Sequence, residues 1–84
     1  MTENEIREIV HQALSNVAPE VDVASLDPAR ELRDQIDMDS VDFLNFVIGL
    51  HKELNLEIPD PDVAKLATLN GCVTYLSTKI KQAS

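Results

Sequence analysis

Asp39-Ser40-Val41-Asp42 stands at the head of a long apolar segment, Phe43 to Leu56, and Glu57-Ile58-Pro59-Asp60 follows it. Asp and Ser are preferred at helix starts, and the spacing of the apolar residues predicts a helix from about Ser40 to Leu54. The sequence therefore places one hydroxyl at the start of a helix, between carboxylates.

This helix is more apolar than a single core contact requires. On a helical wheel its apolar side chains cover roughly 220°, about twice the width of one core-facing side. We therefore expect either a central helix packed on several sides or a helix that keeps part of its apolar surface for a partner or ligand. Its polar residues form one stripe: Asp42, Asn45, Gly49, Lys52 and Glu53.

The residues before Ser40 predict one long helix and a long connection. A capping box, Thr2-x-x-Glu5, begins a helix expected from about Glu3 to Asn16, and Pro19 prevents its continuation. The apolar residues from Val21 to Met38 lack sustained periodicity, so we expect a long loop whose side chains pack onto the core. A short helical turn near Pro28 to Leu32 is compatible with this segment.

Two further helices are predicted after the apolar segment. Asp60 is expected to cap a short helix from Pro61 to Leu66, and Thr68 to cap a longer one from about Leu69 to Lys81. The predicted fold is all-α: a four-helix bundle with three longer helices, one short third helix and a long loop between helices one and two. We expect residues 1–84 to form a single domain.

The composition is that of a small acidic domain, with 84 residues, 44% hydrophobic content and a net charge of -8. That charge argues against nucleic-acid binding and favours basic partners. A single cysteine, Cys72, excludes an internal disulfide, and no Cys/His cluster suggests a metal site. The acidic N-terminus is unlike a secretory or transit peptide, and no apolar run approaches the roughly 18 residues of a membrane span. We expect a cytoplasmic monomer.

Charge is unevenly distributed along the chain. Residues Glu31 to Asp62 include nine acids and two bases, whereas Val63 to Ser84 include three lysines and no acid. The acidic potential therefore belongs to the part of the chain around Ser40. We expect these carboxylates to repel one another on a solvated surface rather than to hold a divalent cation, because their spacing does not match an EF-hand loop.

Three roles for Ser40 follow from the residues alone. The first is purely structural, since Asp39-Ser40 is a good helix start. The second is catalytic, but a nucleophilic serine needs a base in contact with it, and His51 lies about 16 Å along the same helix. The third is a modification site, which needs only exposure, a firm helix start and charges that another protein can recognise. A hydrolase is the least favoured of the three.

The chain as a whole resembles the acyl carrier proteins, whose signature is Asp-Ser-Leu at the start of the second helix. Asp39-Ser40-Val41-Asp42 matches it, with Val41 as a conservative departure. Leu56 to Asp60 matches the segment that follows helix two in that family. Thr68-Leu69 and the pattern Val73, Tyr75, Leu76 match the last helix. The similarity covers nearly the whole chain.

The resemblance implies a carrier rather than an enzyme. Ser40 would hold 4'-phosphopantetheine, transferred from coenzyme A by a phosphopantetheinyl transferase that uses magnesium. The terminal thiol would hold acyl groups as thioesters and shuttle them between enzymes of fatty-acid or specialised lipid and polyketide synthesis. Two alternatives stay open: an amino-acyl or aryl carrier, and an unmodified helical interaction module with the carrier fold.

The resemblance also implies roles for other side chains. Asp39 and Asp42 are expected to contact basic docking patches on acyl-processing enzymes. Val41, Leu44 and Ile48 are expected to form the apolar contacts beside them. The residues expected to form the core or line an acyl pocket are Phe46, Val47, Leu50, Leu54, Ile58, Leu66 and Tyr75.

Several residues depart from the family pattern and indicate a specialised carrier. Asp37 replaces a common glycine, and the usually acidic positions of helix two hold Asn45, His51 and Lys52. Phe43 stands where a small or polar residue is common. We expect Phe43 to pack against the loop or the short helix, with shaping of an acyl pocket as the alternative.

Two further residues have a structural and a functional interpretation. Cys72 is expected to be a small buried hydrophobic residue rather than a reactive thiol. His51 is expected to be a solvated helix residue, with a partner contact that titrates near neutral pH as the alternative.

Overall fold

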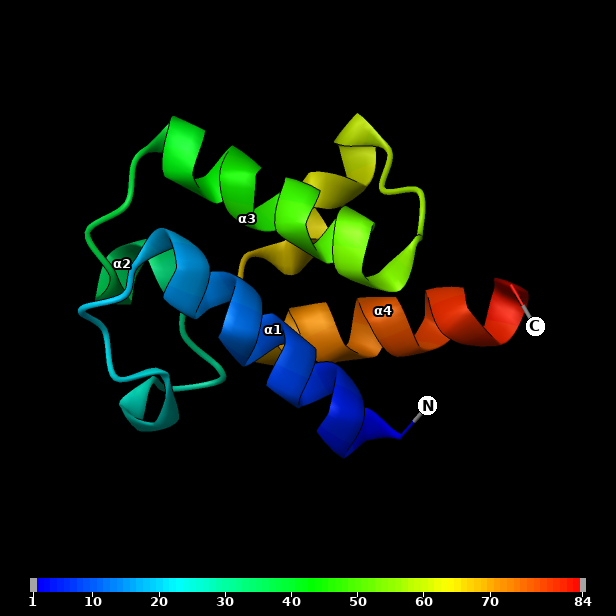
Figure 1. Cartoon of the computed structure of the whole chain (residues 1–84), viewed down its shortest axis with the longest axis horizontal. Helices are drawn as coiled ribbons and strands as arrows, with labels where there is room; N and C mark the ends of the chain where they lie inside the picture. The colour runs from blue at the N-terminus through cyan, green and yellow to red at the C-terminus, as the bar shows by residue number, and fades with distance from the viewer. Residues whose placement is uncertain (1, 84) are drawn as a thin grey trace.

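Three helices of 15 residues each, α1 (Glu3–Val17), α3 (Ser40–Leu54) and α4 (Leu69–Ala83), form the main body of the protein in a computed structural model (Figure 1). The structure describes residues 2–83. Three short elements connect the long helices: the 3₁₀ helix η1 (Val23–Ser25), α2 (Leu32–Gln35) and the 3₁₀ helix η2 (Asp60–Leu66). No strand occurs within the described part of the chain, and the predicted all-α bundle is confirmed.

Helix α1 is the central helix of the bundle, because it packs against both α3 and α4. It begins with the predicted capping box. The Thr2 hydroxyl accepts the Glu5 amide at 3.2 Å, and the Glu5 carboxylate accepts the Thr2 amide at 3.1 Å. The bond from the Thr2 amide lowers the pKa of Glu5. The helix ends one residue beyond the predicted Asn16.

The connection between α1 and α3 gathers at one end of the molecule, away from the C-terminal end of α4 (Figure 1). The turn expected near Pro28 to Leu32 is present: the Asp27 carboxylate accepts the Ala29 amide at 2.9 Å and the Asp27 carbonyl accepts the Arg30 amide at 3.2 Å, which closes a tight turn over Pro28 and Ala29. The short helix α2 follows this turn and begins at Leu32.

Two contacts tie this connection to the rest of the fold. The Gln35 side chain bonds both backbone groups of Asp27, at 2.7 and 2.9 Å. The Leu32 amide donates to the Ala67 carbonyl at 2.8 Å, beside an isolated bridge between Glu31 and Thr68. Because Leu32 is also fully buried, the expected packing of this loop onto the core is confirmed.

Helix α4 starts as predicted, whereas η2 does not. The Thr68 hydroxyl accepts the Gly71 amide at 2.9 Å and so caps α4. Pro59, not Asp60, occupies the N-cap position of η2, and no side chain caps it. The prediction of Asp60 as a cap is therefore wrong, since the helix already includes Asp60. A Cβ at Gly71 would lie 2.5 Å from the Lys65 carbonyl oxygen, so glycine permits α4 to start directly against η2.

The core is mainly aliphatic, with Phe46 and Tyr75 as aromatic members, and it lies between the three long helices. Cys72 is part of it, which confirms its structural interpretation: its thiol donates to the Leu66 carbonyl at 3.3 Å, and burial raises its pKa to about 12. Within the described residues no helix is long and apolar enough to cross a bilayer. The largest fully buried side chains are Phe46, Ile6, Leu14, Leu32, Leu50, Leu66 and Leu76.

Candidate functional site

Ser40 is the first residue of α3, and its hydroxyl is not used to build the helix. Asp39 is the N-cap, since its carboxylate accepts the Asp42 amide at 2.9 Å. Ser40 is exposed, and its hydroxyl has no hydrogen-bond partner among the described residues. The predicted helix start is confirmed, and the capping role falls to Asp39 alone. The Ser40 oxygen is therefore free to form a bond with something outside the chain.

The surroundings of Ser40 lack the partner that a nucleophile needs. His51 lies near the opposite end of the same helix, where its Nδ1 is hydrogen-bonded to the Leu56 carbonyl oxygen. This bond holds the His51 side chain at the C-terminal end of α3, away from Ser40. No side chain among the described residues is hydrogen-bonded to the Ser40 hydroxyl, so these residues supply no base of the kind that activates a nucleophilic serine.

An apolar strip begins beside Ser40 and runs along the exposed side of α3. Val41, Leu44 and Ile48 are 63%, 54% and 39% exposed, and they are the large exposed hydrophobic side chains of the described chain. Their spacing of three and four residues places them on one side of the helix. The excess apolar surface of this helix is therefore explained: one part faces the core and the other faces solvent.

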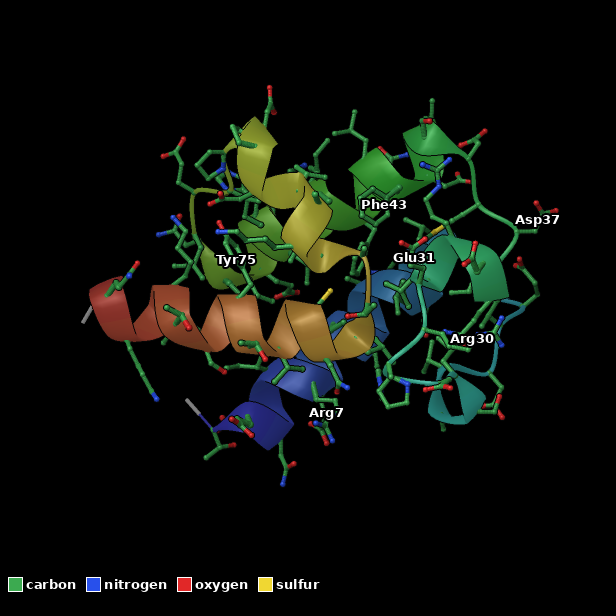
Figure 2. The ribbon with its side chains drawn as sticks, turned by 180° about the vertical axis from the view of Figure 1, so that it is seen from behind. Arg7, Arg30, Glu31, Asp37, Phe43 and Tyr75 are labelled. Carbon is green, nitrogen blue, oxygen red and sulfur yellow. The ribbon has the colours of Figure 1, made fainter. Side chains whose placement is uncertain are left out.

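The acidic residues of the site flank this strip. Asp39 is exposed, and Asp42 is half-buried within the first turn. Asp37 lies at the tip of the preceding loop, and its side chain points away from the bundle (Figure 2). No group of three or more metal-ligating side chains occurs among the residues that the structure describes. The five residues predicted to contact partners thus lie on or next to the first three turns of α3.

On the other side of α3, Phe43 lines a pocket of about 220 Å³. The wall opposite Phe43 consists of Val63, Ala64 and Ala67, on and just after η2, and Arg33 and Glu31 complete the lining. Figure 2 shows Phe43 and Glu31 on this face. The Phe43 ring also packs against Phe46, with centroids 5.9 Å apart. Phe43 therefore packs near the short helix, as expected, and also borders a cavity.

The side chains predicted to form the core or an acyl pocket fill space instead of lining the pocket next to Phe43. Phe46, Val47, Leu50 and Leu66 are buried together in the core, and Leu54 and Ile58 pack against it. Tyr75 is buried as well, but it borders a different pocket beside η2. The sequence did not single out Val63, Ala64 or Arg33, because only the folded chain brings them opposite Phe43.

Tyr75 has a polar partner that periodicity does not reveal. Its hydroxyl donates to an Asp62 carboxylate oxygen at 2.6 Å, and Lys65 lies 3.7 Å from the other oxygen of the same carboxylate. The bond from Tyr75 lowers the pKa of Asp62. Burial, and then the bond to Asp62, raise the pKa of Tyr75 to about 12.

Comparison with known proteins agrees with this geometry. The family profile described as "Phosphopantetheine attachment site" matches residues 4–76. An acyl carrier protein from Wolinella succinogenes is 32% identical over 75 residues, covering 89% of this chain and 92% of that protein. An acyl carrier protein from Chlorobium luteolum is 29% identical and covers 94% of this chain and 100% of that protein. An acyl carrier protein from Lactobacillus acidophilus is 32% identical and covers 70% of this chain and 74% of that protein.

Proposed function

The chain belongs to the acyl carrier protein family, whose members carry 4'-phosphopantetheine and are not enzymes, and from this premise we propose that Ser40 holds that group. The observation that carries the proposal is the state of the Ser40 hydroxyl, which is exposed and unbonded at a firmly capped helix start. Because Asp39 satisfies the helix terminus, attachment at Ser40 would not cost the helix its cap.

The residues fit such a group. A phosphopantetheinyl transferase would form a bond between the Ser40 oxygen and the phosphorus next to pantetheine in coenzyme A and break the phosphoanhydride bond. Adenosine 3',5'-bisphosphate would leave, and the serine proton would be released. When attached, the group supplies a thiol that carries acyl chains as thioesters. The chain itself contributes the attachment oxygen, a rigid helix that presents it, and a surface that other proteins can recognise.

We assign this recognition to the apolar strip and the acids beside it. Val41, Leu44 and Ile48 supply exposed apolar area, and Asp39 and Asp42 supply negative charge at the end where Ser40 lies. An enzyme with a basic patch next to an apolar patch would be complementary to this surface, because the basic patch would face the two acids and the apolar patch would face the strip. Acyl groups would then pass between successive enzymes that dock in the same way.

The departures of α3 support a dedicated rather than a general pathway. His51 is bonded to the Leu56 carbonyl, and Lys52 adds positive charge where the family pattern is acidic. We therefore infer a carrier for specialised lipid or polyketide synthesis and expect slow transfer by enzymes of general fatty-acid synthesis. Equal transfer rates with general and dedicated enzymes would contradict this assignment.

The pocket beside Phe43 is a suitable place for the cargo nearest the attachment point. It lies one helical turn from Ser40, and its walls include Val63, Ala64 and Ala67. Phe43→Ala should enlarge it and increase the protection of a bound acyl thioester from hydrolysis. The matched variant Phe43→Leu should change protection less, because it keeps most of the side-chain volume. Unchanged hydrolysis rates in both variants would exclude this pocket as the cargo site.

Intact mass after co-expression with a broad-specificity phosphopantetheinyl transferase tests the assignment of Ser40. We expect a gain of one phosphopantetheine, abolished in Ser40→Ala and retained in Ser25→Ala, a control at another exposed serine. No gain, under conditions that modify a control carrier, would overturn the proposal. It would favour an unmodified interaction module, for which the exposed apolar strip is the supporting observation. Mass profiling of the natural cargo separates an acyl from an amino-acyl carrier.

A further inference from the structure

The apolar strip of α3 ends next to a lysine. Ile48 is the last large exposed apolar residue of the strip, and Lys52 follows it by four residues, on the same side of the helix. Lys52 also lies eleven residues beyond Val41, which is close to three full turns, so the two side chains leave the helix in directions only about 20° apart. The docking surface assigned above therefore continues from the strip onto Lys52.

The acids nearest to Lys52 in sequence border other surfaces. Lys52 is exposed and forms no ion pair among the described residues. Glu53 lines a pocket together with side chains of α1, and Glu57 lines one with side chains of α4. A Cβ at Gly49, one turn before Glu53, would lie 3.8 Å from the Ala13 Cβ, so this side of α3 faces α1. Lys52 therefore presents its charge to the solvent at the end of the strip.

The other polar side chains of this part of α3 bring no negative charge to the strip. Glu53 is the only acid between Phe43 and Leu54. Asn45 is exposed and neutral. His51 is held by the bond between its Nδ1 and the Leu56 carbonyl oxygen, and Nδ1 carries the proton because a carbonyl oxygen only accepts.

The two ends of the docking surface thus differ in the sign of their charge. Asp39 and Asp42 lie at the end next to Ser40, and Lys52 lies at the other. Ten residues separate Asp42 from Lys52, which is about 15 Å along the helix axis. That distance exceeds the Debye length of about 8 Å at physiological ionic strength, so a docked protein meets two separate charges rather than their sum.

We propose that Lys52 is a specificity-determining contact of this docking surface. It favours enzymes that place a carboxylate opposite it and disfavours enzymes whose docking patch is basic along its whole length, because like charges that meet at an interface oppose binding. The partner that fits is basic where it meets Asp39 and Asp42, apolar along the strip and acidic at the far end. This inference rests on the proposed function and names the chemistry of the partner.

Lys52 also has a structural role that needs no partner. A cation near the C-terminal end of a helix stabilises the helix dipole. A substitution that acted only through this role would change the stability of the chain and leave the KM of a docking enzyme unchanged. Kinetics measured on the folded chain therefore separate the two roles.

Transfer of phosphopantetheine from coenzyme A to the full unmodified chain tests the inference, with a broad-specificity transferase chosen for its basic docking patch as the probe. Lys52→Glu should lower KM about twofold to fivefold, the scale of one exposed charge pair, and leave kcat unchanged. Lys52→Gln should have an intermediate KM. Arg7→Glu is the matched control and should keep the original KM. It changes the net charge equally, and Arg7 lies on the side of the bundle away from α3 (Figure 2).

Reversing charges on the transferase tests the preference for a carboxylate. Each basic residue of its docking patch is changed to glutamate in turn. At least one of these transferase variants should have a lower KM for the original chain than for Lys52→Glu, because its new carboxylate would lie opposite the lysine.

Three results would overturn the inference. The first is an equal KM for the original chain and Lys52→Glu. The second is an equal decrease in Lys52→Glu and Arg7→Glu, which would indicate an effect of net charge rather than a contact. The third is a preference for Lys52→Glu that no transferase variant reverses. If no variant of the chain were modified while a control carrier was, the proposed function itself would be wrong, and this inference with it.

Discussion

Tyr75 and Asp62 join the last helix to the short helix η2 through a hydrogen bond of 2.6 Å, in which the phenol donates to the carboxylate. The two residues are thirteen positions apart, so the contact exists only in the folded chain. It gives the buried end of Tyr75 its polar partner, as buried phenols usually require. The contact is one of several that hold η2, which supplies Val63 and Ala64 to the wall of the pocket beside Phe43.

The first prediction concerns pH. Asp62 has a folded pKa below its ordinary value of 3.8, so its contribution to stability is present above about pH 4 and is lost as the pH falls through the lowered value. Tyr75 has a folded pKa of about 12 against an ordinary value of 10.0, so its contribution is present below pH 10.0 and is lost as the pH rises toward 12.

Tyr75→Phe removes the phenol and the largest cause of the lowered pKa of Asp62, and it provides the measurement. We expect the difference in urea midpoint between the original chain and Tyr75→Phe to be largest between about pH 5 and pH 9 and to shrink at both extremes. The subtraction cancels the titration of the other carboxylates. Midpoint curves that remain parallel from pH 3 to pH 11 would show that the bond to Asp62 does not contribute.

The second prediction separates the two roles of Asp39. Asp39→Ala removes the cap on the Asp42 amide and should lower the free energy of unfolding by about 1 kcal/mol in urea denaturation. Asp39→Asn keeps a capping oxygen and should stay within a few tenths of a kcal/mol of the original stability. If the carboxylate also attracts basic enzymes, both variants should be modified more slowly by a transferase. Equal stability of the two variants would argue against the cap.

The third prediction uses the two glycines as a matched pair. A Cβ at Gly71 would meet the Lys65 carbonyl at 2.5 Å, whereas one at Gly49 would meet the Ala13 Cβ at an ordinary 3.8 Å. Gly71→Ala should therefore destabilise the chain by roughly 1–3 kcal/mol through overpacking. Gly49→Ala should stabilise it by about 0.5–1 kcal/mol, because alanine loses less conformational entropy in a helix. Thermal or urea unfolding measures both, and changes of the same sign would contradict the packing described for Gly71.

The fourth prediction compares a buried and an exposed leucine of α3. Leu50 is fully buried and Leu44 is 54% exposed. Leu50→Ala should cost about 2–5 kcal/mol of unfolding free energy, through lost burial and a cavity. Leu44→Ala should change stability by no more than roughly 0.5 kcal/mol, but it should slow transfer to docking enzymes. A normal transfer rate in Leu44→Ala would remove this residue from the proposed docking surface.

Features encoded within a few residues could be predicted from the sequence. The bounds of α3, Ser40 to Leu54, agree with the prediction, and the caps by Thr2 and Thr68 were both anticipated. A cap requires a side chain only three residues from the amide that it bonds, so the signal is local. The same local pattern left open which of Asp39 and Ser40 caps α3, and the structure assigns the cap to Asp39.

Features that depend on distant parts of the chain could not be predicted. The start of α2 is set by the turn at Asp27 and by the bond from Leu32 to Ala67, thirty-five positions further along the chain. The pocket beside Phe43 needs Val63 and Ala64 from η2, and no periodicity in either segment indicates that they meet.

The enclosure of Cys72 has a practical consequence for work on the carrier. It is the chain's one cysteine, it is fully buried, and its thiol stays protonated far above neutral pH. Chromogenic disulfide reagents should therefore leave the bare folded polypeptide untouched. Any thiol that these reagents detect in the native protein would be the free terminal thiol of an attached phosphopantetheine group. An absorbance titration would therefore count the chains that carry the prosthetic group without an acyl group.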